Sequence, residues 1–177
     1  MLTYILLLLV LAVAIIFVLA SKKPDEFRVT RNILINAPAS ITFEQVNDLE
    51  KSQKWSPWVE MEPDAAYKME GPKAGVGATL HWEGKKTGKG TMSITESRPD
   101  EFVRNRLEFY KPMRATNTAE FKLDIQGDKT QVTWTMYGPN KFMGKVMSLF
   151  MNCEKMVGDQ FEKGLSNLKA VVESKKL

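Results

Sequence analysis

The residues with the most reactive side chains in this sequence are few and far apart. The 177 residues include one histidine, His81, and one cysteine, Cys153. Nucleophilic catalysis needs a base beside a hydroxyl or thiol, and His81 alternates with Trp82, which directs its ring away from the apolar side of that segment. One cysteine cannot form an internal disulfide, and one cysteine with one histidine cannot complete a zinc site. The sequence therefore predicts no catalytic triad, no metal centre and no cofactor.

Two asparagines are better candidates for chemistry. Asn105 and Asn117 stand among residues of apolar parity in neighbouring strand-like segments, so both side chains are expected to face the interior. A buried amide needs a partner, which is backbone, trapped water or a ligand. The carboxylates of these segments mostly have the polar parity and form no obvious acid/base pair. Both asparagines are predicted ligand contacts, with a purely structural role as the alternative.

Large apolar side chains share one parity along the strand-like segments, and we expect them to line an interior cavity. The strands contribute Trp82, Met92, Leu107, Phe109, Ala119, Phe121, Trp134 and Met136. Met147 and Met151 join this wall from the C-terminal helix, because methionine adapts to varied apolar shapes. Trp55 and Trp58 are predicted to form the lip of the cavity, since aromatic loops cover apolar pockets. Ordinary core packing is the alternative for each residue.

Net charge and one glycine-rich segment exclude two further classes of function. Lys and Arg total 25 against 21 Asp and Glu, and the resulting +4 is small for a nucleic-acid-binding protein. Residues 84–91 superficially resemble a phosphate-binding loop, but Gly84 and Gly88 are one residue too close and Gly90 follows Lys89. A strand rather than a helix comes next. We expect a basic hairpin facing anionic lipid, and no nucleic-acid partner.

The elements that position these residues follow an α+β order. Residues 27–35 alternate as a first strand, residues 40–54 favour one or two short helices, and residues 142–173 carry the apolar stripe of one long helix, Cys153 and Met156 included. Six further strands are predicted, separated by hairpin-length turns: 65–70, 78–83, 90–97, 101–110, 114–125 and 130–137. An antiparallel sheet of about seven strands must twist, and if it curls around the long helix it leaves a cavity wherever side chains do not fill the gap. Glycines at 144, 158 and 164 are expected to weaken that helix and let its first half shift.

The first part of the chain is a candidate membrane anchor. Leu2 to Ala20 is a run of nineteen uncharged residues, and such a helix reaches about the ~30 Å of a hydrocarbon core. Lys22 and Lys23 follow the run and no basic residue precedes it, which favours a cytoplasmic domain. We predict an anchor over residues 1–22 and a ligand-binding domain over residues 23–177. The alternative is a signal peptide cleaved after Ala20, which leaves the domain secreted or periplasmic.

Several strings of residues resemble a known superfamily. They are Trp55-Ser56-Pro57-Trp58, residues 71–78, Trp82-Glu83-Gly84, Leu107-Glu108-Phe109 with Pro112, residues 130–134 and residues 161–169. Residues 27–173 as a whole resemble bacterial members of the START-like superfamily, also called SRPBCC, which includes polyketide cyclase/dehydrase and lipid-transport proteins. The resemblance implies the helix-grip fold, in which a curved antiparallel sheet grips a long C-terminal helix around a hydrophobic cavity. No catalytic motif of the superfamily carries over residue by residue.

Three hypotheses for function follow. The first is membrane-anchored binding or transport of a hydrophobic small molecule or lipid, without catalysis. The second is a polyketide cyclase/dehydrase-like enzyme for an apolar substrate, in which Asn105, Asn117 or a strand carboxylate orients a carbonyl or water. The third is a regulator that binds a protein partner through the sheet or the loop from Trp55 to Trp58.

Overall fold

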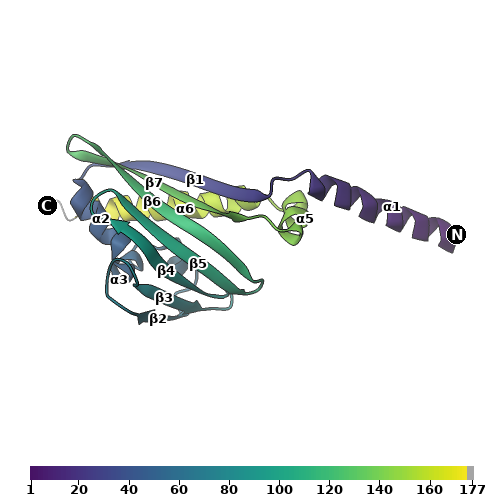
Figure 1. Cartoon of the computed structure of the whole chain (residues 1–177), viewed down its shortest axis with the longest axis horizontal. Helices are drawn as coiled ribbons and strands as arrows, with labels where there is room; N and C mark the ends of the chain where they lie inside the picture. The colour runs from purple at the N-terminus through teal and green to yellow at the C-terminus, as the bar shows by residue number, and fades with distance from the viewer. Residues whose placement is uncertain (175–177) are drawn as a thin grey trace.

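The computed structural model describes residues 1–174 of the chain. In this part the chain forms an N-terminal helix that projects from a folded body made of one sheet and several helices (Figure 1). The projecting helix, α1 (Leu2–Ser21), includes a stretch at Thr3–Ser21 that is long and apolar enough to cross a membrane. Most of its side chains are exposed.

The sheet has seven strands and is antiparallel throughout, as predicted. The strands are β1 (Glu26–Ile35), β2 (Ala66–Glu70), β3 (Thr79–Glu83), β4 (Lys89–Arg98), β5 (Phe102–Lys111), β6 (Ala115–Gln126) and β7 (Lys129–Pro139). Their order is β1-β7-β6-β5-β4-β3-β2, so β2 to β7 form a continuous meander and β1 pairs with the last strand. Short turns join the strands from β3 to β7, and this favours pairing between sequence neighbours.

Three short helices join β1 to β2 and lie on the inner side of the sheet. They are α2 (Ala39–Asn47), α3 (Leu49–Ser52) and α4 (Pro57–Met61). Asp48 begins α3, because its carboxylate accepts hydrogen bonds from the backbone N–H groups of Glu50 and Lys51 at 3.0 and 3.1 Å. Trp58 lies in α4, whereas the sequence predicted a loop from Trp55 to Trp58.

A long C-terminal helix is present as predicted, but it begins at Cys153 and not at Phe142. The chain forms α5 (Phe142–Phe150) and α6 (Cys153–Glu173), separated at Met151, whose backbone is extended with φ −129° and ψ 132°. The Asn152 side chain then accepts a hydrogen bond from the Lys155 N–H at 2.9 Å, which caps a new helix. Cys153 and Met156, expected on the buried stripe, are exposed for this reason.

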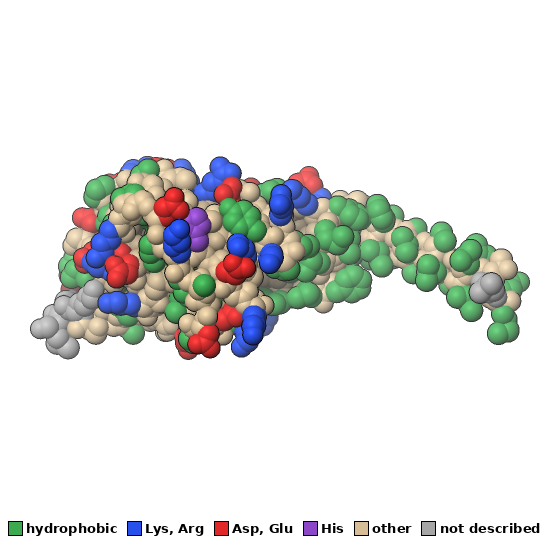
Figure 2. All heavy atoms as spheres, turned by 90° about the horizontal axis from the view of Figure 1, so that it is seen from below, with side chains coloured by type: hydrophobic (Ala, Val, Ile, Leu, Met, Phe, Trp, Pro, Cys, Tyr) green, Lys and Arg blue, Asp and Glu red, His purple; other side chains and the backbone are tan. Residues whose placement is uncertain are grey.

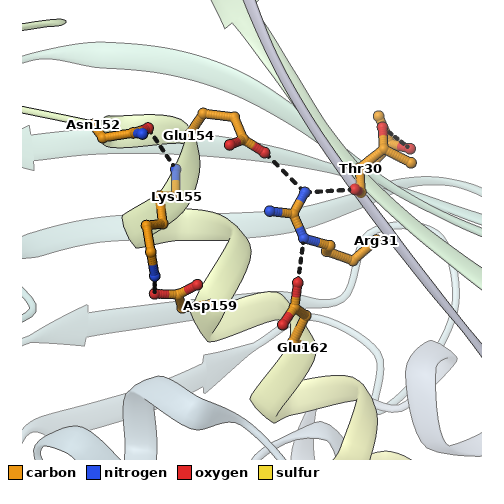
Figure 3. Close-up of polar contacts among 8 residues, drawn as sticks. Thr30, Arg31, Asn152, Glu154, Lys155, Asp159 and Glu162 are labelled. Atoms are coloured by element: carbon orange, nitrogen blue, oxygen red, sulfur yellow. Dashed lines mark hydrogen bonds and ion pairs between the residues drawn. The ribbon is translucent and has the colours of Figure 1, made fainter.

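Helix α6 covers the concave side of the sheet and is attached to β1 by Arg31. The Arg31 guanidinium forms ion pairs with Glu162 at 2.7 Å and with Glu154 at 2.9 Å (Figure 3). It lies directly over Gly158, where any Cβ atom would collide with it. The buried side of α6 includes Phe161, Leu165, Leu168 and Val172. Gly158 thus admits a close contact between helix and strand.

Candidate functional site

A cavity of about 260 Å³ lies between the inner face of the sheet and helices α2, α3, α4 and α6. It is slightly smaller than the ~300–1,000 Å³ typical of small-molecule pockets. The sheet contributes Tyr67, Leu80, Trp82, Met92, Asn105, Leu107, Phe109, Ala119, Phe121, Trp134 and Met136 to its wall. The helices and loops contribute Val46, Leu49, Ser52, Gln53, Trp55, Ser56, Trp58, Thr87, Val157 and Phe161. The wall is predominantly apolar and rich in aromatic rings.

An aromatic cluster forms one side of the cavity. The Trp134 ring stacks on Phe161 at a centroid distance of 4.0 Å and on Phe121 at 4.8 Å. Trp55 and Trp58 meet Trp134 edge-on at 5.7 and 5.6 Å. Trp55 is only 3% exposed, and its Nε1–H donates to the Gln45 carbonyl at 3.1 Å. Trp55 therefore belongs to the inner wall and not to a lip, because the segment between α3 and α4 turns inward.

A second aromatic pair lies toward the β3–β4 turn. Trp82 and Phe109 meet edge-to-face at 5.5 Å, and the Trp82 Nε1–H donates to the Thr87 carbonyl at 3.2 Å. Gly90 is paired with Trp82 across β3 and β4, and a Cβ atom on Gly90 would collide with the Trp82 ring. Glycine at this position allows the ring to lie flat over the neighbouring strand and to close this side of the cavity.

Four polar atoms of the cavity-lining residues are buried without a hydrogen-bond partner in the described part of the chain. They are Gln53 Oε1, Tyr67 Oη, Asn105 Oδ1 and Trp134 Nε1. Asn105 is 1% exposed and is flanked on neighbouring strands by Ile94 and Ala119. Burial raises the pKa of Tyr67, and the nearby Glu62 carboxylate adds to the rise. An unpaired polar atom in an apolar cavity favours a ligand that carries a hydrogen-bonding group.

Three of the predicted ligand contacts lie outside the cavity. Asn117 is at the end of the sheet nearest α1, where its side chain closely approaches Gly138 of β7. Met147 belongs to α5 and Met151 to the break after it, and α5 packs beside α1. Because the helix breaks at Met151, these methionines follow α5 away from the sheet and do not continue the cavity-facing side of α6.

Some residues of the wall were not identified from the sequence. Tyr67 follows the alternation of β2, and that parity could have identified it. Gln53, Val157 and Phe161 face the cavity because of how α3 and α6 pack on the sheet. Strand parity alone could not have revealed that packing.

Glu62 holds the β3–β4 turn beside the cavity through hydrogen bonds. Its carboxylate accepts hydrogen bonds from the backbone N–H groups of Lys85, Lys86 and Thr87 at 2.6, 2.9 and 2.8 Å, and from the Thr87 hydroxyl at 2.9 Å. These bonds, led by the one from the Thr87 backbone, lower the pKa of Glu62 to about 2. The loop that superficially resembles a phosphate-binding sequence thus binds a carboxylate of its own chain.

The remaining reactive side chains are remote from the cavity. His81 lies 3.0 Å from a carboxylate oxygen of Glu70, outside the cavity wall, and Cys153 is exposed. Within residues 1–174, no group of histidine, cysteine and acidic side chains could hold a metal ion. The cavity therefore contains groups that can bind and orient a ligand, and its described wall includes no histidine, cysteine or carboxylate.

Comparisons with known proteins agree with this fold. Residues 26–173 match the family described as polyketide cyclase / dehydrase and lipid transport. Among solved structures, the chain is similar to a protein of Mesorhizobium loti, with a TM-score of 0.63, 10% identity, and coverage of 85% of this chain and 100% of that one. The chain is also similar to a protein of Chromobacterium violaceum, with a TM-score of 0.59, 18% identity, and coverage of 85% of this chain and 99% of that one. For the Aha1 dimer from Colwellia psychrerythraea, the TM-score is 0.59, the identity is 16%, and the coverage is 83% of this chain and 96% of that one. No curated protein matches the chain.

Proposed function

Because the chain belongs to the polyketide cyclase/dehydrase and lipid-transport family, an SRPBCC family, we propose that it binds a hydrophobic small molecule or lipid in the cavity between its sheet and α6. The observation that carries this proposal is the predominantly apolar wall of the cavity, with aromatic rings at both sides. Burial of apolar surface contributes roughly 25 cal/mol per Å² to binding before the costs of association. Such a wall suits a ligand that is mostly hydrocarbon or aromatic.

We further propose that α1 anchors this domain in a membrane. Its length and composition suit a bilayer span, and an anchor would hold the cavity at a high effective concentration near membrane-dissolved ligands. Lys22 and Lys23 directly after the helix favour a cytoplasmic domain. The rival possibility, cleavage of the leader, predicts a mature protein that lacks residues 1–20, and the intact mass of the purified protein distinguishes the two.

Native mass spectrometry of the full chain, extracted gently from its own membrane, tests the binding proposal. We expect a stoichiometric apolar ligand that is released on denaturation. Ala119 lies between Asn105 and Met136 on the cavity wall, so Ala119→Trp should fill the cavity and remove the ligand. Lys122→Trp, which adds the same ring at an exposed position of β6, is the matched control. Equal ligand occupancy in both folded variants would overturn this location for the ligand.

A second candidate function, catalysis of the cyclase/dehydrase type, is favoured by one observation. Asn105 is almost fully buried and its Oδ1 atom has no described partner, so its amide could orient a carbonyl or a water molecule. A turnover assay with the molecule identified by mass spectrometry separates the two functions. Conversion of that molecule by the wild-type chain and its loss in Asn105→Leu would favour catalysis over carriage.

A further inference from the structure

Helix α5 has an apolar surface that the folded body does not cover. No residue of α5 is buried, and Phe142, Met143 and Phe150 are exposed, Phe150 by 72%. Met151 and Met156 extend this exposed apolar surface into the following turn and the start of α6. A nine-residue helix gains little stability from its own hydrogen bonds in water, so a helix with this composition needs an apolar environment.

The position of α5 identifies that environment. α5 lies beside the end of α1 that joins the body (Figure 1), and the rings of Phe17 and Phe142 are 4.5 Å apart. The backbone N–H of Asn140 donates to the Asp25 carbonyl at 2.7 Å, and the Asn140 side chain donates to the Pro24 carbonyl at 3.0 Å. Figure 2 shows hydrophobic side chains continuing from α1 onto the adjacent part of the body. α5 is thus held where α1 would leave a bilayer.

Basic loops lie at this same end of the sheet. The antiparallel register pairs Lys89 with Lys111, so the β3–β4 and β5–β6 turns lie at the end of the sheet where β1 begins and β7 finishes. Lys85, Lys86 and Arg114 are exposed there and form no ion pair with any described residue. The Glu62 carboxylate in this region is occupied by backbone N–H groups. The end of the body nearest α1 therefore presents uncompensated positive charge.

We propose that α5 and these two turns form one docking surface for an anionic lipid bilayer. The apolar side chains of α5 enter the boundary between headgroups and acyl chains, and the basic turns approach lipid phosphates. This proposal rests on the anchoring by α1 proposed above. Thr87 belongs both to the β3–β4 turn and to the cavity wall, so docking brings this side of the cavity close to the lipid.

Spin labels on the full chain test the surface. In a Cys153→Ser background, single cysteines replace Phe150 on α5, Met113 in the β5–β6 turn, and Ile125, which is 66% exposed at the opposite end of the sheet. The chain is reconstituted into phosphatidylcholine vesicles with or without phosphatidylglycerol. For each spin label, the rate of collision with oxygen, which concentrates in lipid, is compared with the rate of collision with a water-soluble nickel complex.

We expect the label at 150 to favour oxygen and the label at 125 to favour nickel in both kinds of vesicle. The label at 113 should lose nickel accessibility when phosphatidylglycerol is present, and Lys85→Glu with Lys86→Glu should reverse that loss. Vesicle flotation tests separately whether α1 anchors the chain in the membrane. If the chain floats with the vesicles but the labels at 150 and 125 have the same oxygen and nickel accessibilities, the docking of α5 is overturned and the anchoring by α1 is not. If the nickel accessibility of the label at 113 does not change with phosphatidylglycerol, the role of anionic lipid is overturned. If the chain does not float with the vesicles, anchoring and docking are both overturned.

Discussion

Asn105 combines near-complete burial with an unpaired Oδ1 atom in an apolar wall. A buried polar atom without a partner costs roughly 1–3 kcal/mol of stability. Asn105→Leu should therefore raise the free energy of unfolding by about 1 kcal/mol, measured by denaturant titration, while it lowers ligand occupancy in native mass spectrometry. Asn117→Leu, outside the cavity, is the control and should leave occupancy unchanged. A destabilised Asn105→Leu protein with full occupancy would indicate that Asn105 serves the fold and not the ligand.

Glu62 predicts a specific dependence of stability on pH. Because folding lowers the pKa of this carboxyl from 4.5 to about 2, its contribution is fully present above pH 4.5 and is lost as the pH falls toward 2. Glu62→Gln removes the charge, so the variant should have a lower melting temperature than the wild type at neutral pH. The difference should shrink progressively between pH 4.5 and pH 2, as measured by circular dichroism.

Asp128→Asn, which replaces an exposed carboxylate in the β6–β7 turn at the other end of the sheet, is the control for Glu62→Gln. Its melting temperature should follow that of the wild type across this range. A difference between Glu62→Gln and the wild type that stays constant down to pH 2 would show that the carboxylate does not bind the turn as a charged group.

At the scale of single residues, the sequence predicted the strand part of the wall well and the helical part poorly. A strand alternates with a period of two, so one known inward residue such as Trp134 assigns Met136 and Val132 to the same face. The cavity-facing residues of α6 depend on how the helix is rotated over the sheet. Hydrophobic periodicity reveals neither that rotation nor the break at Met151.

At the scale of elements, the Asn152 cap stands at the break between α5 and α6. The Asn152 side chain accepts from the Lys155 N–H at 2.9 Å, and loss of such a cap costs about 1 kcal/mol. Asn152→Ala should lower the melting temperature by a few degrees, whereas Asn152→Asp, which retains an acceptor, should preserve it. Equal melting temperatures of the two variants would mean that packing, and not the cap, sets the start of α6.

The second half of α6 meets the aromatic cluster at Gly164. A Cβ atom there would lie 2.9 Å from Trp134 and 3.0 Å from Pro57, both of which are buried. Helix propensity alone favours alanine over glycine by about 1 kcal/mol, but overpacking a buried contact costs roughly 1–3 kcal/mol. We therefore expect Gly164→Ala to be destabilising in thermal unfolding. Ser166→Ala, on the exposed side of α6, should be neutral or slightly stabilising, and the same result for Gly164→Ala would contradict the close packing.

At the scale of the whole molecule, the order of the strands could be predicted because hairpin-length turns link β3 through β7 in sequence order. The placement of β1 beside β7 and of α6 inside the curve followed from the resemblance to helix-grip proteins. The position of α5 could not be predicted. Its apolar residues have the same composition as a core helix, and only the folded body reveals that the core is already complete without them.

This arrangement predicts that the body retains affinity for lipid when most of α1 is absent. A chain that begins at Leu19 keeps the buried Ala20 and loses mainly the packing of α1 on α5, so its melting temperature should stay within a few degrees of that of the full chain. We expect it to sediment with vesicles that contain phosphatidylglycerol at low ionic strength. The Debye screening length falls from about 10 Å at 0.1 M salt to about 3 Å at 1 M, so high salt should release the shortened chain from the vesicles. Persistent binding at 1 M salt would assign the affinity to the apolar side chains of α5, and absence of binding at low salt would mean that the body depends entirely on α1.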